Sequence, residues 1–271
     1  MRRKKTMWIL CMAAMCLVLY TIVVSRMGRQ TDVIFGGAEG GSVRSDSVSF
    51  IDPNATAAPE PTEDIWPDIN IEAPQYYMVR DGHALSSAFK PDVEQIPGTR
   101  SMMFDKAALP HLEDLLEAIK DAGFTVHVAG AYRSYSWQNE LFNRKASQIA
   151  YGMGVDDYMD PLYQDAVAEA KTITMYPGTS EHQLGLAVDL MDREYSRLVY
   201  SNMNQEFFAW LDEHCAEYGF IKRYPTRKLL LTGWDEPWHY RYVGVEAATF
   251  IMEQGLCYEE FYAHYDPNFE Y

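Results

Sequence analysis

The stretch Ser180-Glu181-His182-Gln183-Leu184-Gly185-Leu186-Ala187-Val188-Asp189 joins two metal-binding residue types through a short apolar run. Ligand atoms around one tetrahedral zinc lie roughly 3.3 Å apart. Seven residues of a helix rise about 10.5 Å, so a continuous helix cannot bring His182 and Asp189 to the same ion. A turn at Gly185 followed by a buried strand can, because glycine supplies the backbone freedom. Spacing alone leaves a second interpretation open, in which Asp189 only ends a core strand.

A second segment, Trp234-Asp235-Glu236-Pro237-Trp238-His239-Tyr240-Arg241-Tyr242, supplies further candidates. In a strand, His239 and Arg241 share one face, and the aromatic residues that alternate with them share the other. We expect the aromatic face in the core and the histidine face in a cleft. Pro237 biases Glu236 toward an extended backbone, so Glu236 lies just outside the strand and near His239. Two histidines and a carboxylate leave a fourth zinc position for water, whose proton a nearby carboxylate can take.

The rest of the domain mixes helical and strand patterns without regular alternation. Helices are expected over residues 106–122, 136–150, 165–171, 205–218 and 244–254. Strands are expected over residues 124–129, 187–190 and 238–243. Ser134 or Ser136 is the expected cap of the second helix. This pattern predicts an α+β fold with a small, mainly antiparallel sheet flanked by helices.

The N-terminal residues have a different composition from the remainder. The basic cluster Met1-Arg2-Arg3-Lys4-Lys5 precedes an uncharged, mostly apolar run over residues 7–25. A run of about 20 residues is long enough to cross a bilayer, and the charge bias favours an N-terminus inside the cell. The alternative is a cleaved signal peptide, but the run is longer than the usual apolar region of such peptides and no small-x-small cleavage site follows it. We therefore expect residues 1–25 to be a cytoplasmic basic tail and single-pass membrane anchor, with the remainder extracytoplasmic.

The composition after residue 25 indicates where the folded domain begins and which partners are excluded. Residues 26–75 are rich in Gly, Ser, Pro and Ala, which is typical of a flexible linker, so the folded domain is expected over residues 76–271. The 271-residue chain has a formal net charge of −16 and no basic cluster in this part, which argues against a nucleic-acid partner. We expect a monomer. Export permits a disulfide between Cys215 and Cys257, but two cysteines do not establish one.

One competing catalytic motif is present. Ser87-Ala88-Phe89-Lys90 fits the S-x-x-K pattern of serine D,D-peptidases, but its companions K-T-G and S-D-N are missing. The sequence also lacks the H-E-x-x-H signature of another zinc peptidase class. These absences favour the two-segment zinc site described above.

Three separated elements together match one family pattern. The element S-x-H-x-x-G-x-A-x-D is met by Ser180, His182, Gly185, Ala187 and Asp189. The element E-x-W-H is met by Glu236, Trp238 and His239, and a Y-R-S element with a following Gln is met by Tyr132, Arg133, Ser134 and Gln138. The elements occur in the expected order within residues 75–250. The chain thus resembles the VanY-type D-alanyl-D-alanine carboxypeptidases, within the zinc D,D-peptidase group that also holds VanX-like dipeptidases.

This resemblance implies a fold and a set of roles. The fold is the compact zinc fold shared with hedgehog-like domains. The implied zinc ligands are His182, Asp189 and His239, with Glu236 as the acid and base. Arg133 is implied to stabilise the scissile carbonyl oxygen, although an arginine met without this context is more often a surface ion pair. Ser134, Gln138 and Ser180 are implied to hold the terminal carboxylate and backbone of the substrate, with helix capping or solvent exposure as their alternative roles.

The expected activity is removal of the terminal D-Ala from peptidoglycan stem peptides. Two other functions remain open at this stage. The same scaffold could act as an L,D-carboxypeptidase or endopeptidase, because the motifs do not encode which bond is cut. A non-catalytic cell-wall-binding zinc module is the second alternative, but a purely structural zinc needs no base such as Glu236. The expected partners are peptidoglycan stem peptides and, through the N-terminal helix, the membrane.

Overall fold

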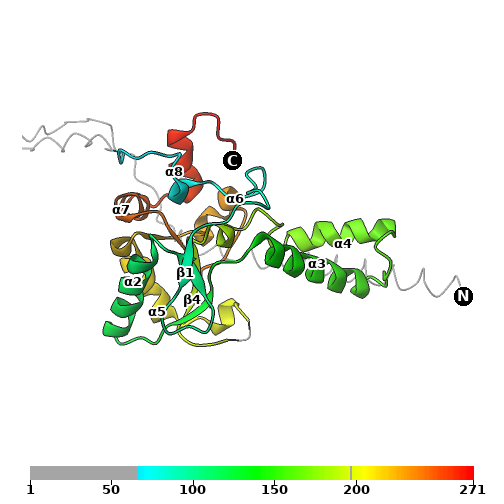
Figure 1. The fold of residues 1–271 in the computed structure, drawn as a ribbon, viewed down its shortest axis with the longest axis horizontal. Helices are drawn as coiled ribbons and strands as arrows, with labels where there is room; N and C mark the ends of the chain where they lie inside the picture. The colour runs from blue at the N-terminus through cyan, green and yellow to red at the C-terminus, as the bar shows by residue number, and fades with distance from the viewer. Residues whose placement is uncertain (1–65, 196) are drawn as a thin grey trace, which may run out of the picture. The chain divides into compact units, whose positions relative to one another are not determined.

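The structure, a computed structural model, describes residues 66–195 and 197–271 (Figure 1). The predicted anchor and most of the predicted linker lie outside these ranges. Within them, no helix combines the length and the apolar character needed to cross a bilayer. All of the described residues belong to a single structural unit.

The centre of this unit is a four-stranded antiparallel sheet with the strand order β3-β4-β6-β5. The strands are β3 (His127–Gly130), β4 (Ala187–Met191), β5 (Phe220–Lys222) and β6 (His239–Tyr242). A separate antiparallel pair is formed by β1 (Val93–Gln95) and β2 (Met103–Asp105). The predicted class, a small antiparallel sheet flanked by helices, is therefore confirmed.

One face of the sheet is covered by α2 (Leu109–Asp121) and α5 (Gln205–His214). Leucines of α2 and phenylalanines of α5 share a hydrophobic core with Val188, Leu190 and Tyr240. Because side chains alternate along a strand, Asp189 and His239 must lie on the opposite face. The aromatic face of β6 is thus in the core, as its alternation predicted.

A second core lies at the C-terminal end of the chain, around α7 (Val245–Glu253) and α8 (Tyr258–Tyr265). The segment 66–75, which we predicted as the end of the linker, packs against this core. The Trp66 ring stacks on the His264 ring with a centroid distance of 3.8 Å. Apolar side chains at Trp66, Ile69 and Ile71 explain the packing, since they bury area that a Gly- and Ser-rich linker cannot.

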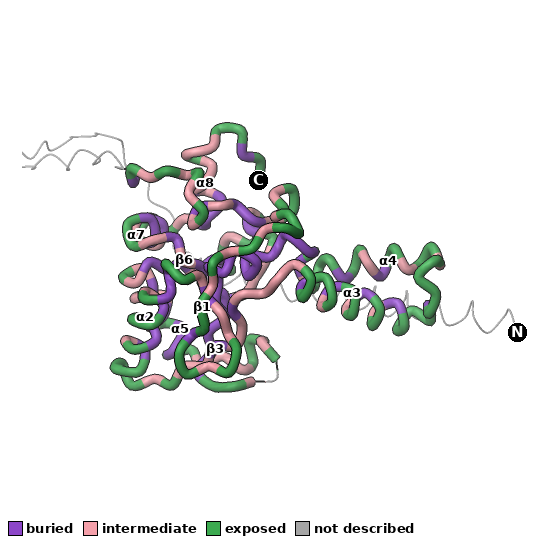
Figure 2. The backbone as a smooth tube through the Cα atoms, viewed as in Figure 1, coloured by how far each residue is buried: buried purple, intermediate pink, exposed green. Residues whose placement is uncertain are grey.

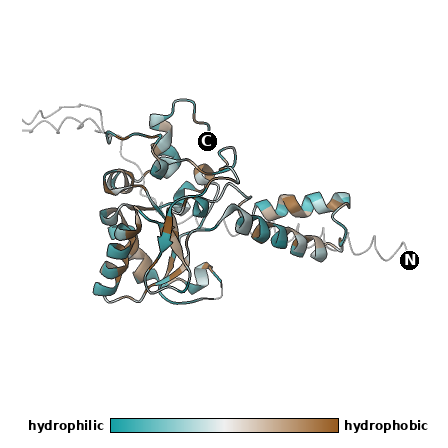
Figure 3. Cartoon of the chain, viewed as in Figure 1, coloured by the Kyte–Doolittle hydropathy of each residue, from teal (hydrophilic) through white to brown (hydrophobic). Residues whose placement is uncertain are grey.

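Two helices, α3 (Tyr135–Gly152) and α4 (Pro161–Lys171), form a hairpin that extends away from the sheet (Figure 1). Burial in this hairpin follows the sides on which the two helices face each other (Figure 2), where the side chains are also mostly apolar (Figure 3). Ser134 caps α3 by accepting a hydrogen bond from the Trp137 backbone N–H at 3.3 Å.

The short α6 (Leu229–Thr232) precedes β6. Cys215 and Cys257 are both buried and free.

Candidate metal centre

The sheet register brings two of the predicted ligands together. Asp189 of β4 and His239 of β6 are direct cross-strand partners, and Gly130 of β3 faces Asp189 from the other side. Directly opposed residues of an antiparallel pair have Cβ atoms only about 5 Å apart. A side chain at Gly130 would collide with the Asp189 Oδ2 atom, so this glycine leaves the space that the carboxylate occupies.

His182 reaches the same place from a turn. It lies in the 3-10 turn Glu181–Leu184, which ends at Gly185 with a left-handed φ of 77°. The chain then enters the sheet as β4, which contains Asp189. The predicted turn at Gly185 followed by a buried strand is thus confirmed.

The donor atoms of the three residues converge. His182 Nε2 lies 3.3 Å from Asp189 Oδ2, and His239 Nδ1 lies 3.1 Å from Asp189 Oδ1. One donor atom from each residue lies within 4.8 Å of the others, and all three side chains are buried. Ligand atoms around tetrahedral zinc are roughly 3.3 Å apart, so these donors fit a zinc ion.

Hydrogen bonds orient both imidazole rings for this role. His182 Nδ1 donates to the Ala131 carbonyl oxygen at 2.8 Å, so its Nε2 lone pair is directed toward Asp189. His239 is turned the other way, with Nδ1 toward Asp189 and Nε2 3.4 Å from Glu181 Oε2. A ligating histidine in zinc proteins almost always donates its second ring N–H to a carbonyl or carboxylate, and both histidines have such a partner.

The electrostatics of the centre favour a cation. Burial lowers the pKa of His182, which keeps this ring neutral with a lone pair to donate. Burial alone would raise the pKa of the Asp189 carboxyl, but His182 and His239 hold it well below its usual range. Burial also opposes protonation of His239, yet hydrogen bonds to Asp189 and Glu181 raise its pKa to about 9. The raised pKa of His239 shows that the site attracts positive charge, and a zinc ion bound there would take the place of the proton on His239 Nδ1.

Glu236 lies at the edge of the centre, just before β6 and near His239, as we predicted from Pro237. Its Oε2 is 3.9 Å from His239 Nδ1, and its side chain is 26% exposed. Burial raises the pKa of Glu236 to about 7; the positive charges of His239 and Arg133 oppose this shift. A carboxyl group with a pKa near neutrality can both accept and release a proton at physiological pH.

Arg133 approaches from the loop between β3 and α3. Its backbone N–H donates to the His182 carbonyl oxygen at 3.0 Å, and its guanidinium donates to Ser180 Oγ at 3.3 Å. Burial lowers the pKa of Arg133, against the opposing charges of Asp189 and Glu236. The Arg133 Nε atom is buried without a hydrogen-bond partner among the described residues. Arg133 is therefore not a surface ion pair but a desolvated cation beside the two carboxylates.

The three remaining predicted residues have different surroundings. Ser180 is buried and contacts Arg133. Ser134 caps α3, which was one of its two expected roles. Gln138 is buried, and its Nε2 donates to the Met175 carbonyl oxygen at 2.6 Å, while its Oε1 has no partner within the described part of the chain. By contrast, Ser87 of the competing S-x-x-K motif lies in an exposed turn.

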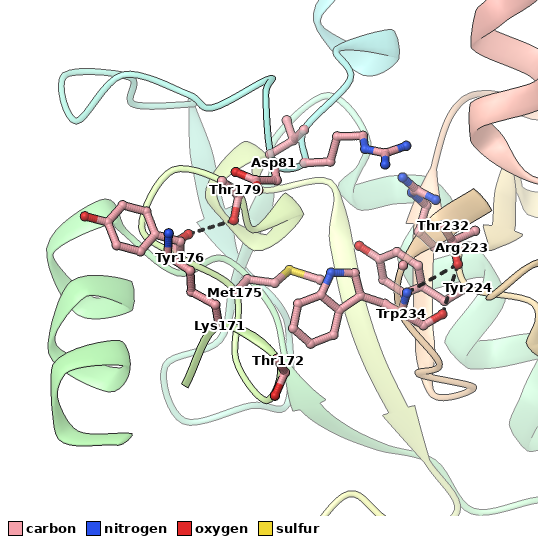
Figure 4. A pocket seen from close by; sticks show the side chains of 13 residues that line it. Asp81, Lys171, Thr172, Met175, Tyr176, Thr179, Arg223, Tyr224, Thr232 and Trp234 are labelled. Atoms are coloured by element: carbon pink, nitrogen blue, oxygen red, sulfur yellow. Dashed lines mark hydrogen bonds between the residues drawn. The ribbon is translucent and has the colours of Figure 1, made fainter. Parts of the chain in front are cut away.

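A cavity of about 350 Å³, drawn in Figure 4, is lined by neighbours of the centre rather than by the three candidate ligands themselves. It is lined by Thr179, which precedes Ser180, and by Tyr224, whose ring centroid is 5.0 Å from that of His239. Trp234 lies beside Tyr224, whereas Asp81 and Thr179 lie across from them (Figure 4). The cavity can hold the part of a ligand that extends away from the metal centre.

Four charged residues near the centre were not identified from the sequence as site residues. They are Glu181, Arg223, Arg241 and Glu259, all of them buried. The one available signal was the position of Arg241 on the same strand face as His239. Their partners are far apart in the chain, so no local pattern indicates that they meet.

Three comparisons with known proteins agree with this geometry. The model of the VanY family, described as D-alanyl-D-alanine carboxypeptidase, matches residues 101–245. A D-alanyl-D-alanine carboxypeptidase of Enterococcus faecalis is 40% identical over 187 residues, which cover 68% of this chain and 64% of that protein. The chain thus spans less than two thirds of the length of this relative.

Two solved structures are also similar. One is a mutant of the vancomycin-resistance D,D-pentapeptidase VanY in complex with Zn(II), with a TM-score of 0.58 and 36% identity over 70% of this chain and 99% of that one. The other is VanYB in complex with D-alanine-D-alanine, with a TM-score of 0.56 and 38% identity over 68% of this chain and 94% of that one.

Proposed function

Since the chain belongs to the VanY family of D-alanyl-D-alanine carboxypeptidases, we propose that it is a zinc peptidase that removes the terminal D-Ala from peptidoglycan stem peptides. The observation that carries this proposal is the convergence of His182, Asp189 and His239 with Glu236 beside them. The similar VanY structures hold Zn(II) in one case and D-alanine-D-alanine in the other, which supports the choice of metal and substrate.

The proposed mechanism uses Glu236 for both proton transfers and Arg133 for the developing negative charge. When bound, zinc polarises the scissile carbonyl and lowers the pKa of water. Glu236 accepts a proton from the attacking water as the oxygen–carbon bond forms. It then delivers the proton to the amide nitrogen as the carbon–nitrogen bond breaks, and free D-Ala leaves. Arg133 donates a hydrogen bond to the former carbonyl oxygen, which becomes negative during attack.

Substrate binding is assigned to Ser180 and Gln138, and Ser134 is assigned a supporting role at the start of α3. Ser180 Oγ is adjacent to the Arg133 guanidinium, so both can contact the same peptide end. The buried Gln138 Oε1 is an acceptor that suits a peptide N–H. Ser134 stabilises the first turn of α3, which follows directly on Arg133. The cavity beside Thr179 and Tyr224 accommodates the upstream residues of the stem peptide.

An assay with two peptides tests the proposal. The full-length chain is incubated with a pentapeptide ending in D-Ala-D-Ala and with the corresponding tetrapeptide, and the products are identified by mass spectrometry. Loss of one D-Ala from the pentapeptide alone supports the D,D-carboxypeptidase. Cleavage of the tetrapeptide alone indicates an L,D-carboxypeptidase, internal cleavage indicates an endopeptidase, and binding without cleavage indicates a wall-binding module.

Replacement of Arg133 by alanine is expected to lower kcat/KM about 10²–10³-fold, the cost typical of one lost donor to a developing oxyanion. The zinc content is expected to stay at the wild-type level, because Arg133 is not a candidate ligand. The matched control is Arg144→Ala in α3, the helix that follows Arg133; the Arg144 side chain is 53% exposed. Equal kcat/KM values for the two variants would contradict the assigned role of Arg133.

The cellular location is part of the proposal. The domain is held outside the cytoplasm by the apolar run within residues 1–25, since the basic cluster and the length of the run favour a single crossing with the N-terminus inside. The full-length chain is expected in the membrane fraction, and a variant without residues 1–30 in the soluble fraction. Recovery of the full-length chain as a soluble protein would contradict the anchor.

A further inference from the structure

A set of four charged residues lies buried beside His239, near its Nε2 atom. Glu181, Arg223, Arg241 and Glu259 each expose 1% or less of their surface. Glu181 lies in the turn before β4, Arg223 directly after β5, Arg241 in β6 and Glu259 in α8. Glu259 is outside the residues that the family model matches. Burying a charge is costly unless it is paired and hydrogen-bonded, so a set of this size requires an explanation.

The contacts within the set give every nitrogen of the Arg223 guanidinium and both oxygens of Glu259 a hydrogen-bond partner, whereas Arg241 Nη1 makes only an ion pair. Arg223 donates to both oxygens of Glu259, at 2.7 and 2.9 Å. Arg223 Nε also donates to Glu181 Oε1 at 2.7 Å, and Arg241 pairs with the same oxygen at 2.9 Å. The Arg241 side chain further donates to the Gln75 and Tyr77 carbonyl oxygens. Two acids and two bases balance in charge, which offsets the cost of desolvation.

The second oxygen of Glu181 is left for the metal centre. Neither arginine contacts Oε2, which lies 3.4 Å from His239 Nε2. Because His239 Nδ1 faces Asp189, a metal bound there requires the ring hydrogen to be on Nε2. Glu181 Oε2 is the acceptor for that hydrogen. The two arginines fix the carboxylate so that this oxygen cannot turn away.

We propose that Glu181 is a positioning residue for the metal ligand His239: held by Arg223 and Arg241, it fixes the ring orientation and the tautomer in which Nδ1 can bind zinc. This inference rests on the zinc site of the proposed function. Glu181 touches neither substrate nor metal and acts only through His239. Outer partners of ligating histidines of this kind are worth about 10- to 100-fold in metal affinity.

Glu181→Gln removes this acceptor without changing the side-chain volume much. The amide of glutamine has one acceptor and one donor end. If the donor end faces the arginines, N–H groups oppose each other; if it faces His239, the ring hydrogen moves to Nδ1, where zinc binds. Either arrangement disturbs His239, so the affinity for zinc is expected to fall about 10- to 100-fold.

Glu259→Gln is the matched control. Glu259 is as buried as Glu181 and pairs with the same arginine, but no contact joins it to His239. The Glu259→Gln variant therefore also removes one buried negative charge, from a carboxylate that pairs with Arg223 and Arg80, and leaves the acceptor of His239 in place. A merely structural role for Glu181 predicts the same result for both variants.

The experiment measures the zinc dissociation constant of the full-length chain by competition with a chelator, and the d–d absorption spectrum after replacement of zinc by cobalt. Weaker zinc binding and an altered cobalt spectrum in Glu181→Gln, with wild-type values in Glu259→Gln, are expected. Equal effects in both variants, or none in Glu181→Gln, would overturn the inference.

Two further comparisons keep the test decisive. If Glu181→Gln does not fold, Glu181→Asp keeps the charge but withdraws the oxygen from His239, so a zinc affinity below that of the wild type is expected; wild-type affinity would overturn the inference. Because the readout is metal binding, a wild type that binds zinc without releasing D-Ala refutes the proposed activity and leaves this test intact.

Discussion

Glu236→Gln is expected to lower kcat for D-Ala release about 10²–10⁴-fold, the range by which one positioned acid–base group accelerates proton transfer. Glutamine has nearly the same shape as glutamate but cannot accept the proton of the attacking water. Burial raises the pKa of Glu236 to about 7, so this carboxyl group can exchange protons near neutral pH. Zinc is expected to remain bound, because Glu236 is not among the three converging donors.

Asp235→Asn provides the control for this variant. Asp235 is the adjacent carboxylate, and its Oδ1 accepts a hydrogen bond from Thr226 at 3.0 Å. Its replacement is expected to leave kcat and zinc content near the wild-type values. Near-normal kcat in Glu236→Gln would contradict the assignment of the base, and loss of zinc from that variant would show that Glu236 is instead a ligand.

Asp189→Asn is expected to have the second large effect. The Asp189 carboxylate is the only negatively charged candidate ligand and contacts both histidines. An asparagine retains one oxygen and turns an NH₂ group toward a histidine nitrogen, so the three donors no longer match a cation. Zinc supplies several kcal/mol of transition-state stabilisation, so its loss is expected to lower kcat/KM by about 10³-fold or more. Metal analysis and the D-Ala assay on the same preparation measure both consequences.

The control for Asp189→Asn is Asp192→Asn. Asp192 is also buried and directly follows β4, but its oxygens bind Arg193 and Tyr195. The control variant is expected to keep both zinc and activity. If both variants lose zinc alike, the effect is general damage to β4. Partial recovery of Asp189→Asn at high zinc concentration would show weakened binding in a folded protein.

The parts of the fold that depend on local pattern were predictable. The apolar residues of α2 repeat at helical spacing, and the helix found, Leu109–Asp121, lies within the predicted 106–122. Alternation in β6 placed Tyr240 in the core and His239 on the opposite face. The turn at Gly185 followed from ligand geometry, because only a turn brings His182 and Asp189 together.

The parts that depend on distant partners were not predictable. The strand β5 and the pair β1–β2 span only three residues each, too few for a clear alternation. The packing of Trp66 requires His264 and α8, which lie at the other end of the domain. In the sequence, nothing distinguishes Glu181 from an ordinary exposed glutamate beside His182. Its burial depends on pairing with Arg223, 42 positions away.

The site shows the same division. The two motifs predicted which residues meet at the metal centre, because each motif fixes its own backbone. They did not predict that Gln138 hydrogen-bonds the chain after α4, since Met175 is 37 positions away. The desolvation of Arg133 also depends on the fold, because it requires the His182 turn against its backbone.

One measurement tests the central claim most directly: the initial rate of D-Ala release from a pentapeptide by the full-length chain, depleted of metal and then titrated with zinc. The zinc site proposed here predicts no release by the metal-depleted protein and a rate that rises to a plateau at one zinc per chain. Undiminished D-Ala release after metal removal, or a release rate that does not change as zinc is added, would contradict the zinc mechanism.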